Sequence, residues 1–336
     1  MILHPLIIAL VVGSALVSLM TLTSSWLGFR ILKCWDIVSG SELQIELEKK
    51  TYLVSTLMAY AFIFEILSFF LFIYTAEDLH WLFTGAMCAA GSLNANEYGY
   101  RALLMKIAAF ILAGLWLVMN HADNRARDYP LIKEKYAFLL LLTPFVLAGT
   151  YFQGAYFLNL RANVITSCCG SLFGSDHTLT QNLMSFISGF RVNPLREAFY
   201  LTAFFSMGAG ILFHRGFDWL GSVFSASSLT FFLVSAVSLV SFICLYIYEL
   251  PTHHCPFCLL QSDYFYIGYL FYGSLLGGVI SGVGVGILMP FRRIGSLKES
   301  LPEFQKKLAC LSAILSFAFT ALATWKMICS NFILPL

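Results

Sequence analysis

Charged residues are scarce in this sequence. Asp, Glu, Lys and Arg make up 11% of the 336 residues, whereas soluble domains contain about 25%. This scarcity excludes an ordinary soluble globular protein. A basic excess is also lacking, because 20 Lys and Arg stand against 18 Asp and Glu and the formal net charge is only +2. Without a basic face, the chain is not expected to bind nucleic acid.

Two common catalytic motifs are also missing. The sequence contains no GxxxxGK[ST] phosphate-binding loop and no HExxH zinc-binding helix. These absences argue against a nucleotide-hydrolysing enzyme and against a metalloprotease of the HExxH type.

Hydrophobic residues are abundant instead, at 59% of the chain, and the mean hydropathy is +0.80. A membrane-spanning helix needs about 20 mostly apolar residues, and no apolar stretch shows the strict alternation of a barrel strand. We therefore predict an all-α, polytopic integral membrane helical bundle of about eight transmembrane helices in a lipid bilayer. It is expected to form a single membrane domain over residues 1–336 with no soluble domain. The predicted spans are 5–26, 52–75, 102–120, 137–158, 198–213, 222–248, 264–290 and 308–330.

Lys and Arg are distributed unequally between alternate loops. One set of loops holds fourteen: Arg30, Lys33, Lys49, Lys50, Arg125, Arg127, Lys133, Lys135, Arg215, Arg292, Arg293, Lys298, Lys306 and Lys307. The other set holds four: Arg101, Arg161, Arg191 and Arg196. Because cytoplasmic loops carry the excess, we predict that both termini are extracytoplasmic. Lys106 and Lys326 fall near span ends, where long side chains can reach the membrane interface.

This orientation places five of the nine cysteines outside the cytoplasm: Cys88, Cys168, Cys169, Cys255 and Cys258. Disulfides persist in oxidising compartments such as the bacterial periplasm. We therefore predict a bacterial inner-membrane protein whose cysteine-rich loops carry redox or soft-metal chemistry on the extracytoplasmic side. Five cysteines leave at least one unpaired in any internal scheme, which suits a reactive or intermolecular thiol.

The sharpest local signal is Cys255-Pro256-Phe257-Cys258, which follows His253 and His254. Two thiols separated by two residues at the start of a helix exchange readily, because the helix dipole stabilises the first thiolate. A neighbouring histidine can lower a thiol pKa or move protons. The pattern favours redox activity, with metal binding and a static loop disulfide as alternatives.

Residues 255–278, CPFCLLQSDYFYIGYLFYGSLLGG, resemble the active-site region of the membrane thiol:quinone oxidoreductases of the DsbB and vitamin K epoxide reductase families. In those families a CxxC stands at the extracytoplasmic start of a spanning helix in a small helical bundle. The resemblance implies that Cys255 and Cys258 exchange electrons with a quinone. It also implies a second cysteine pair that exchanges electrons with an extracytoplasmic partner protein. Where the DsbB family often has an Arg for the quinone site, this sequence reads Gln261-Ser262-Asp263.

Cys168, Cys169 and Cys88 are the candidates for that second set of thiols. Adjacent cysteines rarely pair with each other, because their Cα atoms are about 3.8 Å apart and a normal disulfide needs about 4.4 Å or more. We expect one of the two to pair with Cys88 or with the CPFC motif. Simple packing of Cys88 in its loop is the alternative.

Glu65 stands near the centre of the second predicted span, where an ionisable group is costly and usually faces a cavity or a partner. We predict that Glu65 and His254 handle protons. For Glu65, the alternative is a protonated carboxyl group that packs against a neighbouring helix through a hydrogen bond. The seventh span carries a set of glycines that predicts close helix packing: Gly273, Gly277, Gly278, Gly282, Gly284 and Gly286.

Three functions fit these features. The first, which we expect, is a membrane thiol/disulfide oxidoreductase that exchanges electrons between extracytoplasmic cysteines and a quinone or redox partner. The second is a protein that binds or transports a soft metal (Cu, Zn or Hg), with ligands among His253, His254, Cys255 and Cys258. The third is a non-catalytic membrane anchor subunit of an electron-transfer complex.

Overall fold

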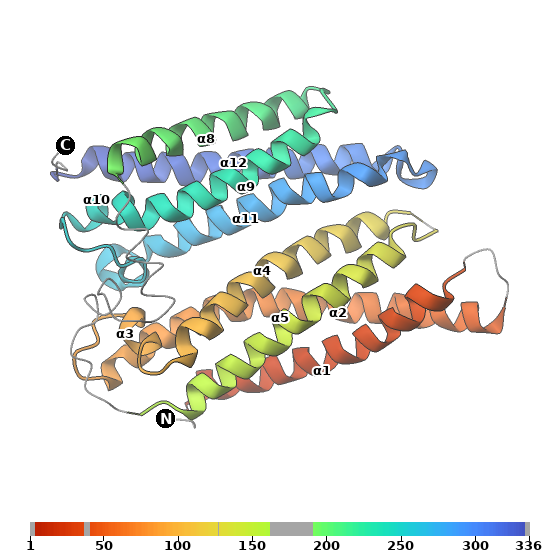
Figure 1. Ribbon diagram of the computed structural model, residues 1–336, viewed down its shortest axis with the longest axis horizontal. Helices are drawn as coiled ribbons and strands as arrows, with labels where there is room; N and C mark the ends of the chain where they lie inside the picture. The colour runs from red at the N-terminus through yellow and green to blue at the C-terminus, as the bar shows by residue number, and fades with distance from the viewer. Residues whose placement is uncertain (1–3, 37–40, 127, 162–190, 333–336) are drawn as a thin grey trace. The chain divides into compact units, whose positions relative to one another are not determined.

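The computed structural model describes residues 4–36, 41–126, 128–161 and 191–332. Within these ranges all the regular secondary structure is helical and no strand occurs. Figure 1 shows that long helices make up most of the described chain, as in a polytopic membrane bundle. The predicted all-α membrane fold is therefore confirmed.

Seven helical segments of the described chain are long and apolar enough to cross a membrane. Four are in the first half: α1 (Pro5–Cys34), α2 (Glu42–Asp78, continued by the 3-10 turn η1, Leu79–Leu82), α4 (Tyr98–Asp123) and α5 (Ile132–Leu158). Two more are α11 (Ile267–Leu288), continued by η5 (Met289–Arg293), and α12 (Ser300–Cys329). The seventh runs from α9 (Leu220–Ser238) through one π-helical turn, η2 (Leu239–Ile243), into α10 (Cys244–Tyr248).

The span predicted at 198–213 forms helix α8 (Val192–His214), which is not among those seven. Its 23 residues correspond to about 34 Å, enough for a hydrocarbon core of about 30 Å. Its first turns carry polar or helix-breaking residues, namely Asn193, Pro194, Arg196 and Glu197. The helix is therefore long enough to span a bilayer but less apolar than the other seven.

The described helices group into two compact units. Unit 1 comprises Met1–Thr75, Asn96–Arg161 and Pro290–Phe304, and it contains α1, most of α2, α4 and α5. Unit 2 comprises Ala76–Ala95, Ala162–Met289 and Gln305–Leu336, and it contains the short helix α3 (Ala89–Leu93), α8 to α11 and most of α12. A single membrane domain over residues 1–336 stays a prediction.

Polar contacts join α1 to α5 in unit 1. Ser25 Oγ lies 2.5 Å from Thr143 Oγ1, and Ser18 Oγ lies 2.7 Å from Thr150 Oγ1. Gln153 donates its side-chain amide to the Leu10 carbonyl at 3.0 Å. Lipid tails are as apolar as a leucine side chain, so such hydrogen bonds and close packing hold membrane helices together.

Two buried ion pairs also lie in unit 1. Lys106 Nζ is 3.2 Å from Glu65 Oε1 and donates to Ser68 Oγ at 3.1 Å, which joins α4 to α2. Lys135 Nζ is 2.6 Å from Asp123 Oδ2 across the α4–α5 turn. The expectation that Lys106 extends to the membrane interface is wrong, because its side chain is buried and neutralised by Glu65 inside the bundle.

Unit 2 shows the close packing that the glycines of α11 predict. A Cβ atom added to Gly282 would lie 2.5 Å from the Ser228 Cβ of α9, and one added to Gly286 would lie 2.5 Å from the Ser225 Cβ. Gly273 is different, because a Cβ atom there would meet nothing within 4 Å. Part of the glycine set thus sets the distance between α9 and α11.

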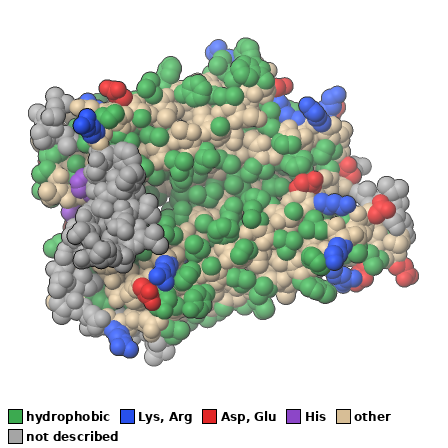
Figure 2. Space-filling model, viewed as in Figure 1, with side chains coloured by type: hydrophobic (Ala, Val, Ile, Leu, Met, Phe, Trp, Pro, Cys, Tyr) green, Lys and Arg blue, Asp and Glu red, His purple; other side chains and the backbone are tan. Residues whose placement is uncertain are grey.

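Hydrophobic side chains cover the sides of the helices in the face drawn in Figure 2, and most Lys, Arg, Asp and Glu side chains lie toward helix ends. Large apolar side chains are exposed along both units, for example Leu16 and Leu67 in unit 1 and Leu201, Phe204 and Phe317 in unit 2. Apolar surface of this extent matches lipid rather than water.

Candidate functional site

Three of the predicted cysteines meet inside unit 2. The Sγ atoms of Cys88 and Cys255 are 3.6 Å apart although the residues are 167 positions apart in the sequence. The Sγ atoms of Cys88, Cys255 and Cys258 all lie within 4.8 Å of one another. All three side chains are buried, with exposed fractions of 0%, 0% and 5%. Cys168 and Cys169, the other two predicted site cysteines, lie outside the described residues.

Cys88 is held at the start of helix α3. Its backbone is extended (φ −163°, ψ −178°), and α3 begins at the next residue, Ala89. The Ala89 amide donates to Glu77 Oε2 at 2.6 Å. The first amides of a helix lack partners within the helix, and a carboxylate there also interacts favourably with the helix dipole. Glu77, in the last turn of α2, therefore fixes the residue that follows Cys88.

The CPFC segment occupies an irregular loop between α10 and α11. The chain leaves α10 through Glu249, which adopts the left-handed conformation with φ 55°. Cys258 then begins a single 3-10 turn, η3 (Cys258–Leu260), which is followed by η4 (Ser262–Tyr264). Because α11 starts only at Ile267, neither thiol lies at its N-terminus. The expectation that the dipole of the following span stabilises the first thiolate is therefore wrong.

The end of this loop is conformationally costly. Phe265 and Tyr266 both have φ 54°, in the left-handed region that large side chains rarely adopt. Each such residue costs on the order of 1–3 kcal/mol and persists only where its surroundings enforce it. Here the amides of Phe265 and Tyr266 donate to the carbonyls of Ser262 and Gln261 at 2.9 and 3.1 Å. These bonds set the entry of the chain into α11.

Two tyrosine hydroxyls hold the backbone of the motif. Tyr248 Oη, from α10, donates to the Cys255 carbonyl at 2.6 Å, and Tyr272 Oη, from α11, donates to the Pro256 carbonyl at 2.5 Å. Gly268 allows α11 to approach the loop, because a Cβ atom there would lie 3.0 Å from the Leu259 carbonyl carbon. The loop is thus fixed from the two helices on either side of it.

A polar contact joins the Cys88 segment to the CPFC segment. Gln261 donates its side-chain amide to Glu77 Oε1 at 2.8 Å and to the Met87 carbonyl at 2.7 Å. No motif or spacing in the sequence points to Glu77 or Tyr272. Gln261 was visible only as the start of the stretch where the DsbB family often has an Arg.

The two adjacent histidines have different surroundings. His253 Nε2 is 3.3 Å from Cys258 Sγ, and the His253 ring packs edge-on against Tyr248 with ring centroids 4.5 Å apart. His254 instead directs its Nδ1 to the Val240 carbonyl of η2 at 2.9 Å. His253 is therefore the histidine placed to exchange a proton with a sulphur atom of the cluster. The proton-handling role predicted for His254 stays a prediction.

Tyr264, in η4, is a further tyrosine near the CPFC motif. Its ring packs edge-on against Tyr248 at 4.8 Å. Burial, and then the negative charges of a Cys258 thiolate and of Asp263, raise the pKa of the Tyr264 phenol. Tyr264 is thus protonated at neutral pH and can serve as a hydrogen-bond donor.

Glu65, the other predicted proton carrier, belongs to unit 1, whereas the three sulphur atoms belong to unit 2. Its carboxylate is paired with Lys106. A proton-handling role for Glu65 stays a prediction. In the packing alternative, Glu65 contacts the ammonium group of Lys106, whereas the expected contact was a hydrogen bond from a protonated carboxyl group.

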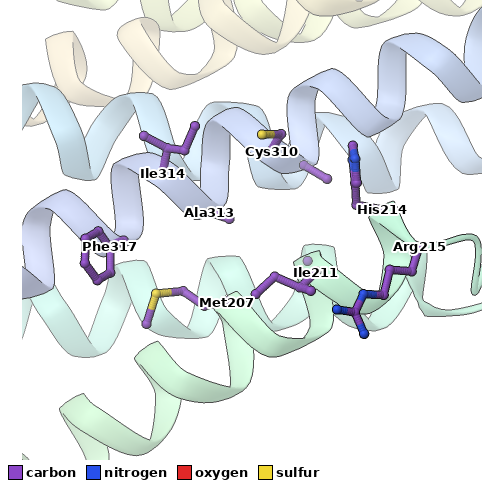
Figure 3. Close-up of a pocket in the computed structure, with 10 residues that line it drawn as sticks. Met207, Ile211, His214, Arg215, Cys310, Ala313, Ile314 and Phe317 are labelled. Atoms are coloured by element: carbon purple, nitrogen blue, oxygen red, sulfur yellow. The ribbon is translucent and has the colours of Figure 1, made fainter.

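An apolar groove of about 400 Å³ lies between α8 and α12 in unit 2 (Figure 3). Met207, Ile211, Ile314 and Phe317 line it, and His214 and Arg215 stand where α8 ends. The 29-residue segment Leu220–Tyr248 follows this end of α8 and leads to the CPFC loop, a length of about 43 Å at 1.5 Å per residue. The groove lies along the middle and the last turns of α8, shares no lining residue with the sulphur cluster, and is not part of the thiol site.

Comparison with protein families, with curated proteins and with solved structures finds no match for this chain. The arrangement of Cys88, Cys255 and Cys258 must therefore be interpreted from its own geometry.

Proposed function

We propose that this chain is a membrane thiol/disulfide oxidoreductase whose reacting groups are Cys88, Cys255 and Cys258. The observation that carries the proposal is the 3.6 Å separation of Cys88 and Cys255 Sγ. A disulfide bond is about 2.05 Å long, so a small rotation of the two side chains would be enough to form it. Polar contacts from Glu77, Gln261, Tyr248 and Tyr272 support the proposal, because they hold both segments in register.

The mutual proximity of the three sulphur atoms suits a disulfide relay. The cycle starts with a Cys255–Cys258 disulfide. The Cys88 thiolate attacks Cys255 Sγ, a Cys88–Cys255 bond forms, and Cys258 leaves as a thiolate. A thiolate of an extracytoplasmic dithiol partner then attacks Cys88 Sγ and displaces Cys255. The second partner thiolate attacks the partner sulphur of this mixed disulfide, displaces Cys88, and the partner departs as a disulfide.

Reoxidation closes the cycle. Cys255 and Cys258 together lose two electrons and two protons and again form a disulfide, and a membrane quinone takes up both electrons and both protons as a hydroquinone. His253 is placed to accept the Cys258 proton, because its Nε2 is 3.3 Å from that sulphur. The same exchanges run in reverse if the reduction potentials of partner and quinone are in the opposite order.

The proposal assigns the sulphur cluster to the extracytoplasmic side of a bacterial inner membrane. The distribution of fourteen Lys and Arg in one set of loops against four in the other supports this orientation. Disulfides also form and persist in that oxidising compartment.

Differential thiol alkylation in native membranes tests the proposed function. Cysteines are labelled with one reagent, the sample is reduced, and the newly exposed thiols are labelled with an isotopic variant of the same reagent. We expect Cys255 and Cys258 to be partly oxidised, and their oxidised fraction to rise when the quinone pool is oxidised. Cys34 and Cys310, whose side chains are exposed, provide internal controls. If Cys88, Cys255 and Cys258 stay fully reduced under every condition of the quinone pool, the proposed function is wrong.

A Cys258→Ser variant tests the relay. Without Cys258, the Cys255–Cys258 disulfide that starts the cycle cannot form, so electron transfer from the dithiol partner to the quinone should stop. A matched Cys310→Ser variant should transfer electrons at the normal rate. Normal electron transfer by the Cys258→Ser protein would contradict the relay.

A further inference from the structure

We infer that the reduced protein binds one Zn²⁺ ion through Cys88, Cys255, Cys258 and His253. The inference goes beyond the proposed function, because it concerns the same side chains in the state in which no disulfide joins them. Three sulphur atoms lie within 4.8 Å of one another, and an imidazole nitrogen lies 3.3 Å from one of them. This is a Cys₃His ligand set, which is one of the common structural zinc sites.

In the reduced state, the separation of Cys88 and Cys255 also fits a tetrahedral ion. With Zn–S bonds of about 2.3 Å, the sulphur atoms of a tetrahedral site are about 3.8 Å apart. Cys88 and Cys255 Sγ, at 3.6 Å, are close to that value. An imidazole nitrogen bonded to the same ion at about 2.0 Å would lie about 3.5 Å from each sulphur. His253 Nε2 is 3.3 Å from Cys258 Sγ but is not within 4.8 Å of all three sulphur atoms, so its ring has to turn toward Cys88 and Cys255 to complete the site.

The surroundings also suit a soft divalent ion. The three cysteines are buried, so an ion held by all four side chains would have little access to water, as in closed structural sites. Thiolate and imidazole ligands select Zn²⁺ or Cu⁺ over Mg²⁺ or Ca²⁺. The ring of Tyr248 packs against His253, and its hydroxyl group holds the Cys255 backbone, so the same residue orients two ligands.

The ligand set differs from the one that the sequence favours as its metal-binding alternative. That alternative uses His253, His254, Cys255 and Cys258. In the structure His254 turns its Nδ1 toward the Val240 carbonyl, and Cys88 supplies the sulphur atom beside Cys255. The zinc site therefore depends on a residue from the segment between α2 and α4.

Zinc binding and disulfide formation use the same sulphur atoms and exclude each other. When Cys88 and Cys255 lose two electrons to a quinone or to a partner disulfide and join as a disulfide, two of the four ligands are lost. The ion is then released. Zinc occupancy would thus follow the redox state of the cluster.

The test uses the full-length protein, purified in detergent under reducing conditions and exposed to Zn²⁺ or Co²⁺ alone. We expect one Zn²⁺ per chain by elemental analysis, and with Co²⁺ the visible absorption of a tetrahedral thiolate complex. Cys88→Ser and His253→Ala should each weaken binding at least about tenfold. His253→Cys should restore binding, because a Cys₄ set also holds zinc. The control variants His254→Ala and Cys310→Ser should bind normally.

Three results would overturn the inference. They are a reduced wild-type protein that retains no stoichiometric zinc, binding that is unchanged in Cys88→Ser, and binding that is lost in His254→Ala but kept in His253→Ala. The wild-type Co²⁺ spectrum does not depend on whether a variant folds. Redox-dependent alkylation without zinc binding would reject this inference alone, and zinc binding by permanently reduced thiols would reject the proposed function alone.

Discussion

Gln261 donates its side-chain amide to Glu77 Oε1 at 2.8 Å, which joins residues 184 positions apart. The other oxygen of this carboxylate accepts the amide that follows Cys88. One acidic side chain therefore positions both the Cys88 segment and the CPFC segment. The separation of Cys88 from Cys255 depends on this polar contact as well as on the packing of the helices.

Replacement of Gln261 by Met should loosen this connection. A hydrogen bond to a charged acceptor contributes about 1.5–3 kcal/mol, so we expect oxidant-induced Cys88–Cys255 disulfide formation to slow by roughly tenfold. The measurement is the rate of cross-linking after addition of diamide, read by mass spectrometry. Ser262→Ala, at an exposed neighbouring position, should leave the rate unchanged. An unchanged rate in Gln261→Met would show that the helices alone position Cys88.

The tyrosine hydroxyls should protect the CPFC backbone. Tyr248→Phe and Tyr272→Phe each remove one hydrogen bond to a motif carbonyl, with a net cost of about 1 kcal/mol. We expect maleimide to label Cys255 several-fold faster in either variant, because the buried loop opens more often. Tyr246→Phe is the matched control, since the contact of Tyr246 is with the ring of Phe332. Equal labelling rates in all of these proteins would count against the assigned role of the two hydroxyls.

Removal of only one partner of the Glu65–Lys106 ion pair should lower the stability of the fold. Lys106→Met leaves a buried carboxylate without its cation, and such changes cost about 3–5 kcal/mol. We expect a clearly lower unfolding temperature for Lys106→Met and a smaller loss for the double variant Glu65→Gln/Lys106→Met. Lys50→Met, which breaks the exposed Lys50–Glu46 pair, should have no measurable effect on the unfolding temperature.

The same double variant separates the two explanations for Glu65. If the carboxylate only pairs with Lys106, the folded double variant should keep its rate of thiol oxidation. If Glu65 carries protons, that rate should fall even where the unfolding temperature is retained.

Close packing between α9 and α11 should make Gly282 intolerant of substitution. In Gly282→Ala the new methyl group would lie 2.5 Å from the Ser228 Cβ, so the helices must separate. We expect a destabilisation of about 1–3 kcal/mol, typical of overpacking, measured by thermal unfolding in detergent. Gly273→Ala, where nothing lies within 4 Å, should be neutral or slightly stabilising because alanine favours the helix. Equal effects at the two positions would exclude steric contact as the cause.

The sequence predicts the helices well because apolar length is a direct requirement of the bilayer. Its predicted boundaries follow hydropathy rather than backbone structure. The second span is expected at 52–75, yet α2 begins at Glu42. Residues 42–51 are mostly polar, which lowers their hydropathy, but they are mostly good helix formers. The π-helical turn at Leu239–Ile243 has no comparable signal in the composition.

The site is less predictable, because it depends on contacts between distant segments. Local spacing identifies Cys255 and Cys258, but it cannot decide that Cys88 lies beside Cys255. It also cannot distinguish His253 from His254, since the backbone direction after Glu249 determines which ring turns toward Cys258. Cys168 and Cys169 lie outside the described residues, and the pairing predicted for them stays a prediction.

The π-helical turn η2 determines the direction around the helix axis in which the side chains of α10 point. Each residue added to or removed from a helix rotates the later side chains by about 100° around the axis. Tyr248 faces the Cys255 carbonyl and the ring of His253 in the present phase. If the same residues formed a regular α-helical turn instead of this wider turn, Tyr248 would turn to another face. The sulphur cluster is therefore sensitive to the helical geometry of a membrane-embedded segment that contains none of its cysteines.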